Sequence, residues 1–207
     1  MKTSSRSVFL SVTTLALVAV GFLVADVRAD HHGDHGSAAA TAGGDAGPGE
    51  GAYLPPFTVT KVAGAEDDGV EAGEKLCYRC KNGSRPQVVV FTKSSDEKVV
   101  ELVKKLDGFA RDHESEQVRV FVNVLNADES AAKADAEKMA SATDAKSIPF
   151  VVPSDNQSGP KSYNVGEDTA VLITMAVDSE IVGNVAVKDA SELDVQMVMD
   201  QAAKMLN

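Results

Sequence analysis

The feature that most constrains the fold is a short apolar run in the first half of the chain. Residues 88–91 read Val-Val-Val-Phe without a polar interruption, and Gln87 and Thr92 flank the run. β-Branched and aromatic residues favour strands, and a strand with no polar alternation is typical of one covered on both faces. The run therefore predicts a central strand in a sheet that carries helices on its two sides.

Segments with helical and strand periods alternate around this run. Apolar residues recur at helical spacing across residues 96–113, and Ser94 with Glu97 forms the capping-box pattern that opens a helix. The other predicted elements are an edge strand (57–62), a strand (118–124), a helix capped by Asn126 (127–142), a strand (148–152), a hairpin (170–177 and 181–187) and a last helix (191–206). Strands separated by helices pair in parallel, and the hairpin adds antiparallel pairing. The order predicts an α/β three-layer sandwich with a mixed central sheet flanked by helices.

Both cysteines of the chain, Cys77 and Cys80, form a C-x-x-C just before the central strand. In an extended strand, residues three apart lie about 10 Å from one another, whereas a disulfide needs Cα atoms within about 7 Å. A bond between them therefore requires Tyr78-Arg79 to turn. Arg79 and Lys81 supply positive charge, which favours a thiolate. The pair is interpreted either as a redox pair or as a structural disulfide that clamps the loop before the strand.

The first 52 residues are predicted to be a leader and a linker. Residues 1–29 read as a signal peptide, with Lys2 and Arg6 ahead of an apolar run and small residues before the predicted cleavage site. An uncleaved anchor is the alternative, although the run of about 17 residues is short of the roughly 20 that span a bilayer. Residues 30–52 read as a disordered linker rich in Gly, Ala and His, and residues 53–207 as one domain.

Export and charge narrow the expected surroundings of the protein. A cleaved leader places it outside the cytoplasm, secreted or periplasmic, where disulfides persist and no stable membrane insertion is expected. The formal net charge of −11, with no basic cluster in the sequence, argues against nucleic acid as a partner.

Three histidines at the start of the linker form a candidate metal site. His31, His32 and His35 lie within five residues, and imidazole is a common ligand of zinc and copper. The site would bind Cu or Zn weakly and flexibly, and a solvated polar tail is the alternative. Cys77 and Cys80 form only half of a zinc knuckle, since zinc needs four ligands and no second pair exists. No other cofactor is expected.

The order of elements and several short motifs resemble the thioredoxin-like superfamily, in particular its redoxin branch, the alkyl hydroperoxide reductase and thiol-specific antioxidant type. Residues 54–59 (Leu-Pro-Pro-Phe-Thr-Val) resemble the strand entry of that family, and residues 83–91 resemble its Gly-Lys-Pro-Val-Val-Leu-Val-Phe segment. Residues 148–155 are similar to its strand with an internal Asp, and residues 163–165 (Tyr-Asn-Val) to its Tyr-Gly-Val. The resemblance implies a thioredoxin-like domain over nearly all of residues 53–207.

The resemblance weakens at the catalytic positions. Active members carry a cysteine where the helix after the first core strand begins, which here is residues 92–96, and this segment has none. The cis-proline of the family would fall near residues 168–169 and is missing, although a second alignment makes it Pro149. The expected strand, C-x-x-C, helix order is also replaced by C-x-x-C, strand, helix.

Two functions from different classes therefore remain. The first is thiol-disulfide or peroxide-linked redox activity, as an oxidoreductase or a peroxiredoxin-like protein, through the displaced Cys77 and Cys80 with a protein thiol or disulfide as partner. The second is a catalytically silent thioredoxin fold that binds a partner or has a structural role, with Cys77 and Cys80 as a structural disulfide or a partial metal site.

Overall fold

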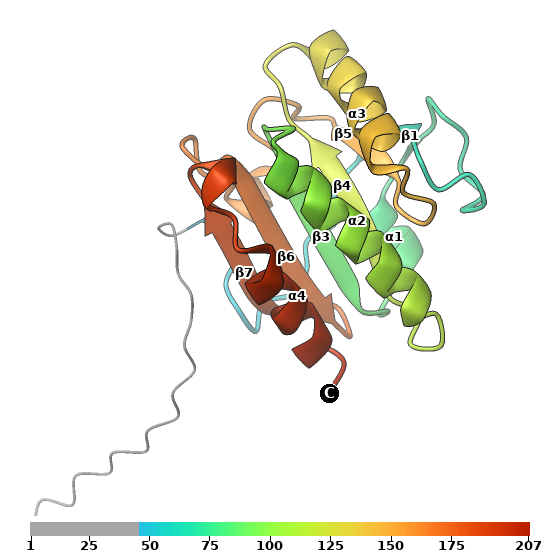
Figure 1. The fold of residues 1–207 in the computed structure, drawn as a ribbon, viewed down its shortest axis with the longest axis vertical. Helices are drawn as coiled ribbons and strands as arrows, with labels where there is room; N and C mark the ends of the chain where they lie inside the picture. The colour runs from blue at the N-terminus through green and yellow to red at the C-terminus, as the bar shows by residue number, and fades with distance from the viewer. Residues whose placement is uncertain (1–45) are drawn as a thin grey trace, which may run out of the picture. The chain divides into compact units, whose positions relative to one another are not determined.

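The computed structural model describes residues 46–207, which build a seven-stranded mixed sheet with helices on both faces (Figure 1). The strands are β1 (Val59–Ala63), β2 (Lys75–Leu76), β3 (Gln87–Thr92), β4 (Arg119–Val124), β5 (Phe150–Pro153), β6 (Val171–Val177) and β7 (Glu180–Val187). The helices are α1 (Tyr78–Asn82), α2 (Glu97–Asp112), α3 (Glu129–Thr143) and α4 (Val195–Lys204), with short 3₁₀ turns η1 (Lys161–Tyr163) and η2 (Ala190–Glu192). The predicted α/β sandwich is confirmed.

β3 occupies the interior of the sheet, as its unbroken apolar run predicts. The strand order is β2-β1-β5-β4-β3-β6-β7, and every residue of β3 is buried. β3 pairs in parallel with β4 and antiparallel with β6, whose hairpin partner β7 closes that edge of the sheet. Asp178 and Ser179 both take positive φ angles, which is the conformation a two-residue hairpin turn requires.

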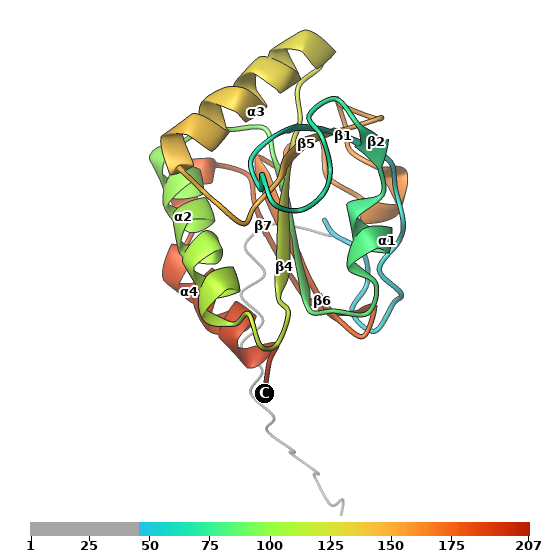
Figure 2. The ribbon, with the colours of Figure 1, turned by 90° about the vertical axis from the view of Figure 1, so that its right-hand side faces the viewer.

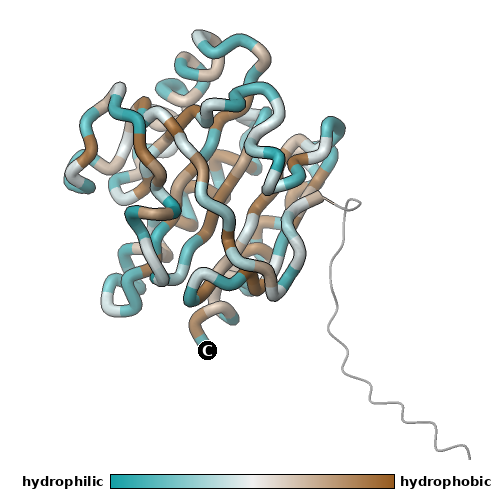
Figure 3. Tube along the Cα trace, turned by 180° about the vertical axis from the view of Figure 1, so that it is seen from behind, coloured by the Kyte–Doolittle hydropathy of each residue, from teal (hydrophilic) through white to brown (hydrophobic). Residues whose placement is uncertain are grey.

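The two faces of the sheet are covered in different ways. One face packs against α2, α3 and α4, and side chains such as Val88, Val90 and Leu102 form the larger core there (Figure 2). The opposite face holds a second core around Val89, Phe91 and other apolar side chains. Seen from behind, irregular chain crosses this face (Figure 3). The short helix α1 lies on the same side of the sheet, away from α2 and α4 (Figure 2).

Residues 46–58, which we call the N-terminal strap, cross that second face. Leu54 is fully buried, and its amide donates to the carbonyl of Ser179 in the hairpin turn (2.8 Å). The amide of Gly51 donates to the carbonyl of Ile181 (2.8 Å), and Phe57 packs against Phe91 with ring centroids 5.6 Å apart. The strap therefore begins ahead of residue 53, where the sequence places the domain boundary.

Two helix caps differ from the predicted ones. α2 is capped by Asp96 and not by Ser94, whose hydroxyl accepts from the Asp96 amide instead. α3 is capped by Asp128 and not by Asn126, whose side chain likewise accepts from the Asp128 amide. In both cases a carboxylate two residues further on takes the cap, because a negative charge complements the positive end of the helix dipole. The predicted caps order the turn that precedes each helix.

Three other boundaries also differ from the predicted ones. The strand predicted over residues 57–62 is β1, but it is not an edge strand, since Lys75–Leu76 pairs outside it as β2. The strand predicted over residues 148–152 starts later, at Phe150. The last predicted helix, residues 191–206, is divided into η2 and α4, because Asp194 accepts from the Met197 amide and starts a new helix there.

Candidate redox site

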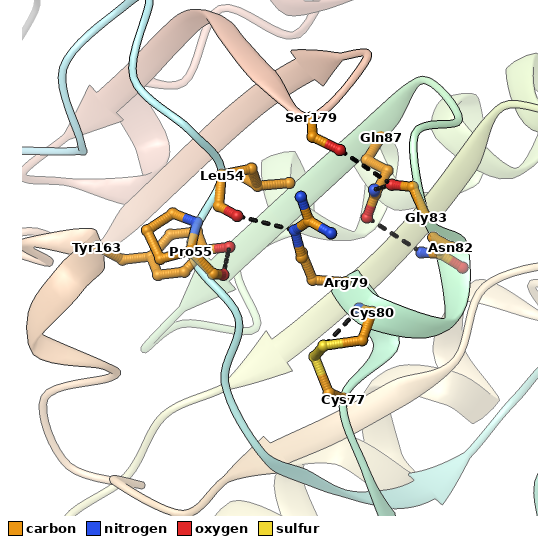
Figure 4. Close-up of a disulfide and its surroundings, with 10 residues drawn as sticks. All are labelled: Leu54, Pro55, Cys77, Arg79, Cys80, Asn82, Gly83, Gln87, Tyr163 and Ser179. Carbon is orange, nitrogen blue, oxygen red and sulfur yellow. Dashed lines mark hydrogen bonds between the residues drawn. A yellow bond between two sulfur atoms is a disulfide. The ribbon is translucent and has the colours of Figure 1, made fainter.

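Cys77 and Cys80 are joined by a disulfide, with Cα atoms 5.2 Å apart (Figure 4). The intervening residues turn as the sequence requires, because Tyr78 starts the one-turn helix α1. Cys77 is the N-cap of α1, and its Sγ accepts a hydrogen bond from the Cys80 amide at 3.0 Å. The bonded pair is thus held at the start of a helical turn, between β2 and β3 in the chain.

The two cysteines and the two residues between them differ in exposure. Cys80 is exposed and Cys77 is half-buried, so Cys80 is the more accessible residue of the disulfide. Tyr78 and Arg79 are only 3% and 5% exposed. α1 is therefore fixed to the second face of the sheet by the residues between the cysteines, independently of the disulfide itself.

Tyr78 connects α1 to the acidic loop of residues 64–73. Its ring stacks on Phe121 with centroids 5.8 Å apart, and its hydroxyl donates to Asp68 Oδ2 at 2.5 Å. Asp68 Oδ1 accepts from Lys61 Nζ at 2.8 Å, and Lys61 also donates to the carbonyls of Ala65 and Val70. Burial, followed by the hydrogen bond to Asp68, raises the pKa of Tyr78 well above its usual range. A satisfied ion pair and a neutral phenol hold the helix here.

Arg79 connects α1 to the N-terminal strap. Its Nε donates to the carbonyl of Leu54 at 2.8 Å, and its guanidinium lies 4.4 Å from the ring centroid of Tyr53. Within the described residues, Nη2 is buried without a hydrogen-bond partner, and no carboxylate pairs with the side chain. Figure 4 shows the guanidinium directed towards Leu54 and away from the two sulfur atoms. Arg79 therefore anchors the helix to the strap, while Lys81 remains exposed; the electrostatic support of a thiolate by these two residues stays a prediction.

The segment in which the family resemblance expects a cysteine lies at the carboxyl end of β3. Residues 92–96 link β3 to α2, and Thr92 Oγ1 both donates to the Ser94 carbonyl and accepts from the Ser94 amide. This is an ordinary turn before a helix cap. The disulfide, by contrast, precedes the amino end of β3. The strand β3 therefore separates the two positions in the chain.

The sheet topology also decides between the two alignments of the missing proline. The strand that pairs antiparallel with β3 is β6, and residues 168–169 lie just before it. Pro149 instead precedes β5, which pairs in parallel with β4 on the other side of β3. The topology favours the alignment at residues 168–169, where the chain has Asp168 and Thr169.

The histidine cluster lies outside the described part of the chain. His31, His32 and His35 precede residue 46, so their metal binding stays a prediction. Across residues 46–207, no group of three or more His, Cys, Asp or Glu side chains is arranged to hold a metal ion.

Comparison with known proteins identifies the fold. No family model and no curated protein sequence matches the chain. Solved structures do match. One is a thiol:disulfide interchange protein DsbE from Chlorobium tepidum, at 13% identity and a TM-score of 0.55, covering 77% of this chain and 99% of that one. The chain has a thioredoxin-like fold.

Two further solved structures share the thioredoxin-like fold. AhpC of Mycobacterium tuberculosis matches at 12% identity with a TM-score of 0.57, over 76% of this chain and 98% of that one. The thioredoxin domain of thiol-disulfide oxidoreductase BVU-2223 from Bacteroides vulgatus matches at 12% identity with a TM-score of 0.56, over 77% and 99%. The resemblance is confirmed at the level of a thioredoxin-like fold; sequence identities this low give no evidence of an activity.

Sequence reasoning identifies the two cysteines of this thioredoxin-like fold and misses what supports them. Lys61 lies in a strand where a lysine is typical of a solvent-exposed position, and only its burial at 3% exposure reveals the ion pair with Asp68. Leu54 belongs to the predicted strand entry, yet its carbonyl is the acceptor for Arg79. The apolar Val70 inside the acidic loop is the one local signal that this loop packs against the domain.

Proposed function

We propose that this protein exchanges disulfides with thiols through Cys77 and Cys80. The observation that carries the proposal is a disulfide with an exposed cysteine, Cys80, on a helix that Tyr78 and Arg79 already fix in place. A catalytic disulfide must be open to attack, and its scaffold must survive reduction. The thioredoxin-like fold supports the proposal, since the matched structures include proteins named as thiol-disulfide oxidoreductases.

The greater exposure of Cys80 supports its role as the cysteine that a partner thiolate attacks. A thiolate of a partner protein attacks Sγ of Cys80, which forms a mixed disulfide and breaks the Cys77–Cys80 bond. The electron pair goes to Cys77, whose thiolate accepts the hydrogen bond that the Cys80 amide already donates. A second thiolate on the partner then attacks the mixed disulfide. The partner leaves as a disulfide and this protein as a dithiol, with two electrons and two protons transferred.

The turn at residues 92–96 supports the alternative function, a catalytically silent thioredoxin fold with a binding or structural role. That segment lacks a cysteine, and Thr92 and Ser94 satisfy one another's hydrogen bonds there. If Cys77 and Cys80 served only as a clamp, their bond would resist reduction until the domain unfolds. Structural disulfides of exported proteins typically have potentials below about −300 mV.

The deciding experiment is a redox equilibrium of the native protein with dithiol buffers, followed by a turnover assay with insulin as the disulfide substrate. Native reduction at a potential above the structural range, together with slow insulin reduction that both Cys77→Ser and Cys80→Ser abolish, is the expected result. A peroxide-consumption assay separates thiol-disulfide exchange from peroxidase activity. Retention of the wild-type rate in both serine variants would sink the proposal.

We also propose that the domain acts outside the cytoplasm. Residues 1–29 are the proposed signal peptide, followed by a linker that leads into the N-terminal strap and the folded unit predicted over residues 53–207. None of the helices within residues 46–207 is long and apolar enough to cross a membrane. Amino-terminal sequencing of the exported chain tests the cleavage. Copper or zinc titration of chains with and without residues 30–45 tests the three histidines.

A further inference from the structure

Several basic side chains line a cavity beside α1, although the protein as a whole is acidic. Its volume is about 590 Å³, within the size range of pockets that take small ligands. It lies where α1, the end of α2, the start of β4 and the loop before β5 meet. Neither cysteine lines it, so a ligand site in this cavity is independent of the redox proposal.

Arginine is concentrated around this cavity, which we call the arginine pocket. The described residues hold four arginines, and three of them, Arg85, Arg111 and Arg119, line the pocket, together with Lys81 and Lys146. The chain as a whole carries a net charge of −11. Scattered surface charges of an acidic protein would not place three of four arginines together. A planar guanidinium is the side chain best suited to grip carboxylate or phosphate oxygens.

Two of these guanidinium groups have no carboxylate partner in the described part of the chain. Arg85 donates to the Gln117 side chain (3.2 Å) and to the Asn82 carbonyl (2.9 Å), and Arg119 donates to the Val118 carbonyl (3.1 Å). These acceptors are neutral, and both arginines are half-buried. Arg111 by contrast is paired with Asp107 at 3.2 Å. Arg85 and Arg119 therefore keep positive charge available to a ligand.

The pocket also has an apolar floor and three acidic residues. Ala110, Val118, Val120 and Pro149 line it and are all buried. Of its acidic residues, Asp68 already neutralises Lys61, whereas Asp67 and Glu114 are exposed and can turn to solvent. An apolar floor beneath two unpaired guanidinium groups suits a ligand with both an apolar portion and an oxyanion.

We propose that the arginine pocket binds a small organic anion, with a carboxylate or phosphate group held by Arg85 and Arg119 and an apolar portion against Val118 and Val120. A ligand that carries only a negative charge does not match the whole pocket, because the apolar floor offers it no polar partner. A purely apolar ligand does not match it either, because such a ligand leaves the two guanidinium groups without an anionic partner.

The test uses the oxidised protein, isotopically labelled, and four probes followed by amide chemical shifts. Phenyl phosphate and benzoate carry both features and separate a phosphate from a carboxylate ligand. Inorganic phosphate carries charge alone, and benzyl alcohol carries the apolar ring alone. One or both aromatic anions are expected to shift the amides of Lys81, Ala110 and Ser147 and to bind more tightly than either control probe, with an affinity that falls as salt is added.

Two variants make the assignment specific. Arg119→Gln is expected to weaken the better anion about tenfold, the size of one lost charge-assisted hydrogen bond. The double variant Arg85→Gln/Arg119→Gln is expected to weaken it on the order of 100-fold by the same reasoning. Lys204→Gln, which removes a positive charge outside the pocket, is the matched control and should leave affinity unchanged.

Three outcomes overturn the inference. They are an absence of localised shifts with both aromatic anions, benzyl alcohol binding as tightly as the anions, and an Arg119→Gln affinity equal to that of Lys204→Gln. Arg119 bonds only to the carbonyl beside it, so this single variant keeps the test decisive if the double variant fails to fold. Insulin reduction by the same variants is expected to stay at the wild-type rate, which separates this site from the disulfide.

Discussion

Replacing both cysteines by serine should destabilise the domain only slightly. The disulfide closes a loop across a sequence separation of 3, and the loop-entropy relation assigns about 2 kcal/mol to a loop this short. Serine at position 77 keeps an acceptor at the N-cap of α1, where Cys77 now accepts from the Cys80 amide. The loss in Cys77→Ser/Cys80→Ser therefore measures the cross-link and not the cap.

The free energy by which the disulfide stabilises the fold also determines how far folding shifts the reduction potential of the disulfide. By the thermodynamic cycle, a disulfide that stabilises the fold by about 2 kcal/mol is stabilised by the fold to the same extent. At roughly 30 mV per 1.4 kcal/mol, the native pair should be about 40 mV harder to reduce than the same pair in the unfolded chain. A shift this small leaves the pair in the range of exchangeable disulfides.

Two measurements check this reasoning. Urea unfolding of oxidised wild type and the double serine variant gives the free-energy difference, and redox equilibria of native and urea-unfolded protein give the two potentials. Cys77→Ala/Cys80→Ser is the matched control, because alanine also removes the cap and should lose a further 0.5–2 kcal/mol, roughly. A loss of about 4 kcal/mol or more in the double serine variant, the upper part of the disulfide range, would refute the argument that Tyr78 and Arg79 already hold α1.

Three further results are expected from the same contacts. In alkaline titration of the folded protein, followed by tyrosinate absorbance, Tyr78 and Tyr163 should stay protonated until the domain unfolds, because burial raises the pKa of both. Raised native pKa values mean that stability is intact below about pH 10 and falls as pH rises above it, so Tyr163→Phe should flatten the alkaline loss seen by urea unfolding. Leu54→Ala should cost about 2–5 kcal/mol, since a fully buried side chain leaves a cavity under the strap; a loss below about 1 kcal/mol would show that the strap does not belong to the core. Reduction should change amide exchange at Lys81, which bonds to the Cys77 carbonyl, by less than about tenfold if α1 is held without the disulfide, whereas a change on the order of 100-fold would contradict that.

The sequence predicts the elements that local periodicity determines. The β3 run, the apolar face of α2 and the hairpin at Asp178 and Ser179 each depend on neighbours in the chain, and each lies within a few residues of its predicted place. The errors concern competition between adjacent polar residues. Ser94 and Asp96 are both good caps, and only the three-dimensional path of the turn determines which of them meets the free amides of α2.

The candidate site is less predictable because its geometry comes from distant contacts. The C-x-x-C and its turn can be read locally, but the direction of Arg79 depends on a carbonyl 25 residues earlier in the chain. The Tyr78 hydroxyl depends on a carboxylate 10 residues earlier, which in turn depends on Lys61. The sequence beside a cysteine therefore does not show which way a neighbouring guanidinium points.

These distant contacts also bear on how a disulfide on α1 could exchange with thiols. In the family that the sequence resembles, the cysteine instead lies at the start of the helix after the central strand. α1 is a single turn, and an isolated helix of that length has no stability of its own in water. Its conformation is held by Tyr78 against Phe121 and Asp68 and by Arg79 against Leu54. Those contacts leave Cys80 facing solvent and do not involve either sulfur atom. A bond on such a turn can open and close while the backbone around it stays in place, which is the property that thiol-disulfide exchange requires and that a clamp does not need.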